Sequence, residues 1–211
     1  MPTLHLEHLD REAYVASIAK LDDEKSSGFA GQARDWWDRH FSWKVPGCMA
    51  LTDEEGEHLS YIFYKIDRYR EYMTVHNLLT PRPNRRRGYA RELMRLVFEQ
   101  AGGDHVRRFR LASLPQSLDF YRAIGLVYWG IDSLGNYYCD LPLPESGLDG
   151  IGPMVQQMGA AELVGRNFDT IYAKVGGNER LLSEEQRRAF ESDRRKLAEG
   201  YRYDALVRLK R

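Results

Sequence analysis

The hydrophobic and polar positions of residues 1–44 predict one strand followed by two helices. Residues 3–9, TLHLEHL, alternate between apolar and polar, as a half-buried strand does. Asp10 then stands at the position of a helix N-cap, and YVASIAKL places its apolar residues at helical spacing. Residues 31–44, GQARDWWDRHFSWK, predict a second helix, which Pro46 and Gly47 bring to an end.

Between residues 48 and 80 the apolar positions follow the period of strands. Alternation runs over residues 48–53, 58–66 and 71–80, and the segments DEEGE and DRYRE separate these runs. Both separators have the glycine-containing or polar composition of short turns. This part of the chain is therefore predicted to form three antiparallel strands.

Helices and strands then alternate up to Pro144. The expected elements are a helix from about Gly88 to Ala101, a strand over 105–113, a short helix over 115–125 and a hairpin of LVYWGID and NYYCDLPL. Gly102-Gly103 is expected to stop the first of these helices. The order β-α-α-β-β-β-α-β-α-β-β predicts an α/β (α+β) fold with a largely antiparallel sheet flanked by helices.

The last part of the chain is predicted to be a helical extension. ESGLDGIG reads as a linker, and residues 151–211 are helical in pattern. Ser183 and Gln186 have the spacing of a capping box, and Gly200 is expected to end the helix that they start. We therefore expect two parts, a domain over residues 1–144 and a C-terminal extension over 145–211 that serves as a lid, a dimerisation element or a packing element.

Composition and charge narrow the classes of function. Lys and Arg number 31, as do Asp and Glu, so a net charge of zero predicts no general affinity for nucleic acid or for a membrane. Cys48 and Cys139 are too few for a disulfide framework or a zinc site, so we expect no metal and a reducing, cytoplasmic compartment. The N-terminal residues lack an apolar leader, and no apolar run reaches membrane-spanning length.

Arginine gathers around one glycine in PNRRRGYARELM, residues 83–94. The stretch joins a predicted strand to a predicted helix, so the first free N–H groups of that helix face the loop. Such a helix start attracts anions, phosphates most of all. Gly88 permits a positive φ, and the small Ala90 keeps the approach to the backbone open. A phosphate ligand explains this cluster, and a solvated helix start that tolerates arginine is the alternative.

A second pattern lies downstream in SLDFYRAIGLVYWG, a short helix with Phe120-Tyr121 that ends at Gly125 before a strand. Together with Arg85-Arg86-Arg87-Gly88-Tyr89-Ala90, it resembles the GCN5-related N-acetyltransferase (GNAT) family, whose acetyl-CoA loop reads Q/R-x-x-G-x-G/A. The predicted element order from about residue 3 to 143 is similar to that of the family. The resemblance implies a GNAT-like fold and transfer of acetyl from acetyl-CoA.

The resemblance implies that acetyl-CoA, as co-substrate, binds two neighbouring segments. Its pyrophosphate is expected on backbone N–H groups from about Arg86 to Arg91, and its pantetheine beside the end of the preceding strand as a short extra strand. The implied cofactor-binding residues are Leu78, Leu79, Thr80, Arg85, Arg86, Arg87, Gly88, Tyr89, Ala90 and Arg91.

Two residues are candidates for proton transfer. An amine attacks as the free base, and forming that base from a lysine-like ammonium at neutral pH costs about 4 kcal/mol. By the resemblance, Tyr121 is the general acid toward the coenzyme A thiolate, and His76 takes part in removing the amine proton, as in arylalkylamine N-acetyltransferases. A core aromatic residue at 121 and a half-buried strand histidine at 76 are the alternatives.

The acceptor is predicted only as a class. Trp36, Trp37 and Trp129 are candidate walls of an aromatic acceptor pocket, with burial in a core as the alternative. We expect a small-molecule or peptide amine that attacks acetyl-CoA directly in a ternary complex; nucleic acid is not expected, and a homodimer is allowed. The alternatives are a transferase for another acyl-CoA or a non-amine acceptor, and a catalytically silent acyl-CoA-binding regulatory module.

Overall fold

The computed structural model describes residues 3–44, 47–67, 69, 71–196 and 202–211. The chain divides into two compact units, Met1–Asp104 and His105–Arg211. Each unit contains antiparallel strands that are covered by helices. This architecture confirms the predicted mixed α/β fold class. The boundary predicted after residue 144 falls inside the second unit.

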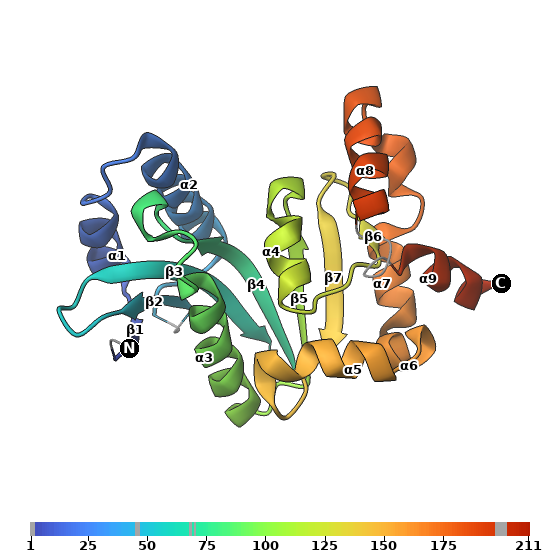
Figure 1. Cartoon of the computed structure of the whole chain (residues 1–211), viewed down its shortest axis with the longest axis horizontal. Helices are drawn as coiled ribbons and strands as arrows, with labels where there is room; N and C mark the ends of the chain where they lie inside the picture. The colour runs from blue at the N-terminus through green and yellow to red at the C-terminus, as the bar shows by residue number, and fades with distance from the viewer. Residues whose placement is uncertain (1–2, 45–46, 68, 70, 197–201) are drawn as a thin grey trace. The chain divides into compact units, whose positions relative to one another are not determined.

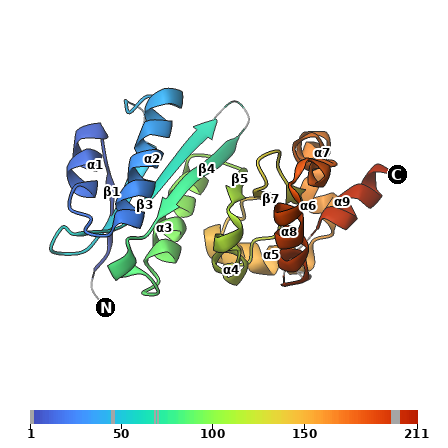
Figure 2. The ribbon, with the colours of Figure 1, turned by 90° about the horizontal axis from the view of Figure 1, so that it is seen from above.

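The first unit is built on four antiparallel strands. Its elements are β1 (His5–His8), α1 (Arg11–Ile18), α2 (Glu24–His40), β2 (Cys48–Thr52), β3 (His58–Asp67), β4 (Tyr72–Leu79), the 3₁₀ turn η1 (Arg82–Asn84) and α3 (Tyr89–Gly103). The strands pair in the order β1-β2-β3-β4. Helices α1 and α2 lie on one face of these strands and α3 on the other (Figures 1 and 2).

Alternating side chains of the strands fill a core on each face of this sheet. Tyr61 and Phe63 of β3 join Tyr14 of α1 and Trp37 of α2 in one buried cluster, in which the Tyr14 and Phe63 rings meet edge to face at 5.0 Å. On the other face, α3 buries a stripe with helical spacing, consisting of Leu93, Met94, Val97, Phe98 and Ala101. Each large side chain of this kind contributes roughly 1.5–3 kcal/mol when it is fully buried.

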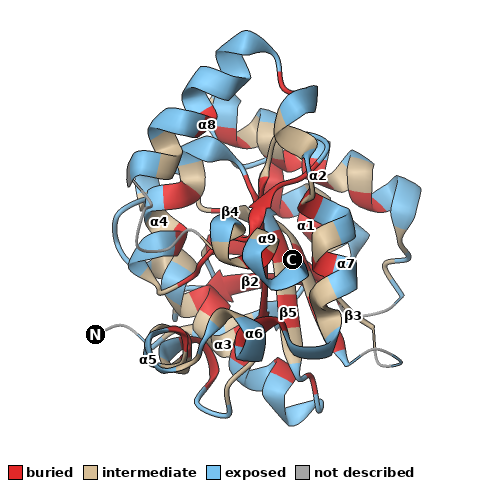
Figure 3. Ribbon diagram, turned by 90° about the vertical axis from the view of Figure 1, so that its right-hand side faces the viewer, coloured by how far each residue is buried: buried red, intermediate tan, exposed pale blue. Residues whose placement is uncertain are grey.

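The second unit combines three antiparallel strands with the C-terminal helices. Its strands are β5 (Arg108–Ser113), β6 (Gly130–Ile131) and β7 (Tyr137–Pro142), and its α-helices are α4 (Leu118–Ala123), α5 (Ile151–Gln157), α6 (Ala160–Val164), α7 (Phe168–Val175), α8 (Glu184–Lys196) and α9 (Tyr203–Lys210). Strand β7 pairs with both β5 and β6. Figure 3 shows buried residues concentrated on the strands, whereas α8 is mostly exposed and buries Phe190.

Several local predictions are confirmed by hydrogen bonds. The Asp10 carboxylate accepts from the Ala13 N–H at 2.8 Å and caps α1. The predicted capping box is also present: the Gln186 N–H donates to Ser183 Oγ at 3.2 Å, and the Ser183 N–H donates to Gln186 Oε1 at 2.9 Å. Pro46, two arginines of the second predicted turn (Arg68 and Arg70) and Gly200 lie outside the described residues.

Four predicted bounds are wrong. Helix α2 begins at Glu24, not at residue 31, because the Asp23 carboxylate caps it by accepting from the Ser26 N–H at 2.8 Å, and it ends at His40. Helix α3 includes Gly102-Gly103 and has its C-cap at Asp104. The segment LVYWGID is buried, but only Gly130 and Ile131 of it form a strand, β6. The expected linker ESGLDGIG contains a 3₁₀ turn and the start of α5, with Leu148 and Ile151 buried.

Candidate functional site

The loop between β4 and α3 presents the open end of a helix. Arg86 (φ 63°) and Gly88 (φ 85°) both adopt left-handed backbone conformations, and Gly88 is the N-cap of α3. No side chain caps this helix, so the first N–H groups of α3 point out of its end without partners inside the helix. Gly88 thus adopts the positive φ that its sequence permits. A Cβ at this position would meet no atom within 4 Å, so the backbone conformation, and not crowding, favours glycine.

Positive charge surrounds this helix start. The side chains of Arg85, Arg86 and Arg87 are exposed. Arg85 Nε donates to the Thr80 carbonyl oxygen at 3.0 Å, so this guanidinium also holds the loop against the end of β4. Two left-handed residues, uncapped N–H groups and adjacent guanidinium groups therefore gather positive charge and N–H donors at one place, a combination that favours an anion.

The three residues at the end of β4 lie directly before this loop. Leu78 and Leu79 pair with Ile62 and Tyr61 of β3, and Leu79 is buried. Thr80 is already engaged, because its hydroxyl lies 2.8 Å from Ser60 Oγ, which also donates to the Leu79 carbonyl oxygen at 3.0 Å. The Thr80 side chain therefore helps to fix the strand end, where the carbonyl oxygens of Leu79 and Thr80 also accept hydrogen bonds.

His76 occupies a β-bulge, which the sequence analysis missed. Phe63 pairs with Asn77 and the next residue, Tyr64, pairs with Val75, so His76 is the extra residue of β4. Its ring lies 4.7 Å from that of Trp36 and 5.1 Å from that of Phe41, centroid to centroid. His76 is half-buried, so its imidazole lies in a partly open aromatic setting.

The three candidate acceptor-side tryptophans differ in burial. Trp37 is 1% exposed within the core of the first unit. Trp129 is fully buried in the second unit, where its Nε1 donates to the Asp140 carbonyl oxygen at 2.8 Å. Both have the core position that the sequence left as the alternative. Trp36 is half-buried, and its ring contacts that of His76.

Tyr121 lies on α4 in the second unit, whereas His76 and the arginine loop belong to the first. It is 8% exposed, and its ring meets Phe120 at 5.0 Å. Burial raises the pKa of Tyr121 well above its ordinary value. The phenol therefore keeps its proton at neutral pH, as a general acid must.

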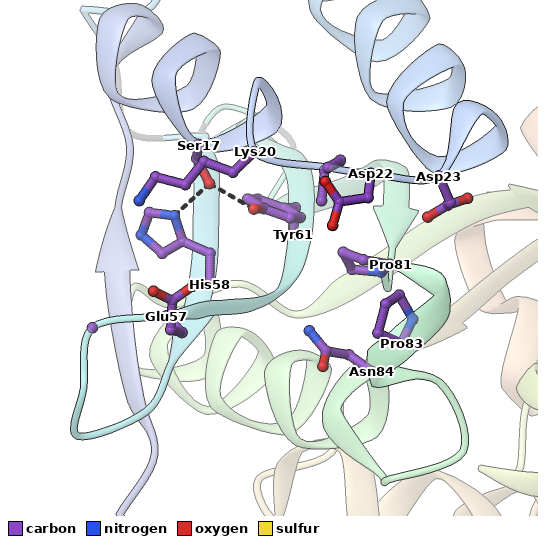
Figure 4. A pocket seen from close by; sticks show the side chains of 12 residues that line it. Ser17, Lys20, Asp22, Asp23, Glu57, His58, Tyr61, Pro81, Pro83 and Asn84 are labelled. Carbon is purple, nitrogen blue, oxygen red and sulfur yellow. Dashed lines mark hydrogen bonds between the residues drawn. The ribbon is translucent and has the colours of Figure 1, made fainter.

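A further polar cluster lies between α1, β1 and β3, and sequence reasoning missed it. Ser17 Oγ lies 2.5 Å from His58 Nδ1 and 2.6 Å from the Tyr61 hydroxyl, and His58 Nε2 lies 3.0 Å from Glu7 Oε2. Figure 4 shows Ser17, His58 and Tyr61 directed toward one another at the wall of a pocket. Ser17 and His58 are 41 residues apart, and no motif in the sequence joins them.

Among the residues that the structure describes, no group of three or more His, Cys, Asp and Glu side chains is arranged to hold a metal ion. No helix within the described ranges is long and apolar enough to cross a membrane.

Comparison with known proteins identifies the family. No curated protein sequence matches the chain. Three solved structures share its fold: a variant of the spermidine N-acetyltransferase SpeG from Vibrio cholerae (12% identity, TM-score 0.52, 66% of this chain and 93% of that chain), a bacterial toxin (14%, 0.52, 75% and 98%) and the PaiA N-acetyltransferase from Thermoplasma acidophilum in complex with coenzyme A (12%, 0.50, 65% and 98%). The sequence model of the acetyltransferase (GNAT) family matches residues 8–126, more than half of the chain. The chain therefore belongs to the GNAT family and is an acyltransferase.

Proposed function

We propose that this acyltransferase moves acetyl from acetyl-CoA to the amine of a small-molecule or peptide acceptor, by direct attack in a ternary complex. The observation that carries the proposal is the start of α3, where two left-handed residues and uncapped N–H groups meet a cluster of exposed arginines. Family membership supports the transfer of an acyl group. Solved relatives named as N-acetyltransferases support an amine as the acceptor.

The loop fits the pyrophosphate of acetyl-CoA. Gly88, Tyr89, Ala90 and Arg91 would donate backbone N–H groups to it, and the neighbouring guanidinium groups would neutralise its charge. Leu78 and Leu79 would offer backbone groups to the pantetheine. Bound in this way, acetyl-CoA supplies an activated thioester carbonyl to the acceptor.

His76 is our candidate for accepting the proton of the acceptor ammonium. A neutral imidazole can take this proton directly or through water, which offsets part of the roughly 4 kcal/mol needed to form the free amine. The contact with Trp36 supports an acceptor pocket with an aromatic wall at this point.

Tyr121 is our candidate for protonating the departing thiolate. The resemblance to the family motif carries this assignment; burial raises the pKa of Tyr121, which keeps the phenol protonated at neutral pH but also makes it a weaker acid toward a thiolate. Replacement of Tyr121 by Phe keeps the buried ring and removes only the hydroxyl. The cytoplasmic location stays an expectation, and a homodimer stays an allowed assembly.

The test is calorimetric titration of acetyl-CoA into the wild type and two variants, Gly88→Asp and Gly88→Asn. The two new side chains have nearly the same shape, and both residue types tolerate the left-handed conformation, so charge is the main difference between them. We expect Gly88→Asp to weaken acetyl-CoA binding by more than about 100-fold, because the new carboxylate would face the anionic pyrophosphate. Each charge-assisted hydrogen bond to the pyrophosphate that is lost would cost about 1.5–3 kcal/mol. Gly88→Asn should weaken binding by less than about 10-fold.

Turnover with a panel of amines completes the test. Tyr121→Phe should lower turnover by about 100-fold or more with acetyl-CoA binding unchanged. Full turnover in this variant would remove Tyr121 from the mechanism. Binding without turnover of any amine in the wild type would favour the silent module, and failure of the wild type to bind acetyl-CoA would overturn the proposed function.

A further inference from the structure

The hydrogen bonds around Ser17 define one consistent direction of proton donation when the imidazole of His58 is neutral. Glu7 is a carboxylate and only accepts, so His58 Nε2 carries the hydrogen and donates to Glu7 Oε2 at 3.0 Å. His58 Nδ1 is then an acceptor, and it receives the hydroxyl hydrogen of Ser17 at 2.5 Å. Tyr61 in turn donates its phenolic hydrogen to Ser17 Oγ at 2.6 Å.

This arrangement has the parts of an activated nucleophile. A hydroxyl lies within hydrogen-bond reach of an imidazole, and a carboxylate orients that imidazole from its far side. We propose that Ser17 is the nucleophile, His58 the general base and Glu7 the positioning residue of a second catalytic site, which cleaves short-chain carboxylic esters or thioesters with neutral or cationic leaving groups. The proposal goes beyond acetyl transfer from acetyl-CoA and does not depend on it.

The pocket beside Ser17 sets the size of the substrate. It encloses about 160 Å³, several times the roughly 30 Å³ that one water molecule occupies in the liquid. Ser17 is 6% exposed, and it lines the pocket together with His58 and Tyr61 (Figure 4). A space of this size suits a short acyl group and the atoms next to its carbonyl.

Charge at the pocket wall sets the preference for the leaving group. Three carboxylate residues, Asp22, Asp23 and Glu57, line the pocket, and Lys20 supplies the opposing charge. An anionic leaving group would be repelled by the carboxylates, whereas a neutral or cationic one would be accepted. Lys20 lies on the same side of the pocket as Ser17, where its positive charge would favour a developing oxyanion (Figure 4).

The reaction balances without any further reactant than water. Ser17 Oγ forms a bond to the acyl carbon while its proton passes to His58 Nδ1, and the bond from that carbon to the leaving oxygen or sulfur breaks as His58 returns the proton to it. Water then attacks the acyl-serine, again giving a proton to His58, which protonates Ser17 Oγ as the acid is released. The net change is ester or thioester plus water to carboxylic acid plus alcohol or thiol.

The experiment measures p-nitrophenyl acetate hydrolysis and covalent labelling by a fluorophosphonate probe, with the labelled residue located by peptide mass spectrometry. In the full-length wild type we expect one label, on Ser17. Ser17→Ala should lose the label and at least about 100-fold in kcat/KM, and His58→Gln should lose about 10²–10⁴-fold. Glu7→Gln should lower kcat with KM unchanged, which a purely structural role would not predict. Acetylthiocholine should be cleaved and acetyl-CoA should not.

Ser42→Ala is the matched control, because the Ser42 hydroxyl is exposed and accepts from the Lys44 N–H at 3.2 Å instead of facing a histidine. It should keep full labelling and hydrolysis. A wild type that is not labelled, or that is labelled at another residue, overturns the proposal whether or not the variants fold. Hydrolysis that survives in a folded Ser17→Ala protein also overturns it, and the cluster is then only a structural network. Neither reaction needs coenzyme A, so these outcomes are independent of acetyl-CoA binding.

Discussion

Replacing Asp140 by asparagine tests how the C-terminal residues are held in the second unit. The Asp140 side chain is fully buried in β7, and its Oδ1 accepts from Arg108 Nε at 3.0 Å and from Nη2 at 2.7 Å. The same guanidinium donates through Nη1 to the Leu163 carbonyl oxygen at 2.9 Å. One buried ion pair therefore connects β5, β7 and α6.

The size of the effect follows from what the substitution leaves behind. The new amide would keep one oxygen as an acceptor but lose the charge, so a guanidinium whose side chain is only 12% exposed would lose this counter-ion. Removing one partner of a buried ion pair costs about 3–5 kcal/mol. Because the amide retains one acceptor, we expect the lower end, about 3 kcal/mol, which corresponds to a fall in Tm of about 6–12 °C for a chain of this size.

The assay combines urea unfolding with hydrogen exchange followed by mass spectrometry. Asp35→Asn is the matched control, because it breaks an Arg–Asp pair whose carboxylate side chain is 58% exposed. Such a pair is worth about 0–1 kcal/mol. Asp140→Asn should reduce amide protection in Leu163 and its neighbours far more than in residues 3–44. A loss of stability below about 1 kcal/mol, or one equal to that of Asp35→Asn, would refute this account of the pair.

Two further predictions concern the second unit. At Gly125 (φ 89°) a Cβ would lie 2.7 Å from the backbone of Gly152, whereas at Gly56 (φ 78°) it would meet open space. Gly125→Ala should therefore lower the free energy of unfolding in urea by at least about 2 kcal/mol more than Gly56→Ala does. Equal losses in the two variants would contradict the role of the close approach. Burial raises the pKa of Glu179. The contribution of this residue to folding stability is therefore fully present below the ordinary carboxyl pKa and is lost as pH rises through the raised pKa. Glu179→Gln should therefore increase stability at pH 7 by under about 1 kcal/mol and flatten that pH dependence, as thermal melts between pH 4 and 8 would show; a less stable variant at pH 7 would contradict it.

What the sequence could predict depended on how local the determining contacts are. The Asp10 cap, the Ser183–Gln186 capping box and the positive φ of Gly88 each depend on residues within one turn of the position concerned. The early start of α2 at Asp23 was missed because the segment DDEKSSGFAGQ has few apolar residues to mark a helical period, although its cap was present in the sequence.

The missed parts of the candidate sites depend on pairing between distant segments. The bulge at His76 exists because β3 and β4 change register there, and no residue type in β4 marks the change. Ser17 and His58 meet because α1 crosses the strands at the place where β3 begins. The burial of Trp129 also could not be predicted from the sequence. An aromatic residue in an apolar run is equally compatible with a core and with a pocket until its spatial neighbours are known.

The first unit alone contains the parts that we assign to acetyl-CoA binding. The strand end at Thr80 and the uncapped helix start at Gly88 follow one another from β4 into α3, and the hydrogen bond from Arg85 Nε to the Thr80 carbonyl oxygen joins them. Tyr121 belongs to the second unit. Changes at Gly88 should therefore act on acetyl-CoA binding and changes at Tyr121 on turnover, and this separation distinguishes a catalyst from a module that only binds acyl-CoA.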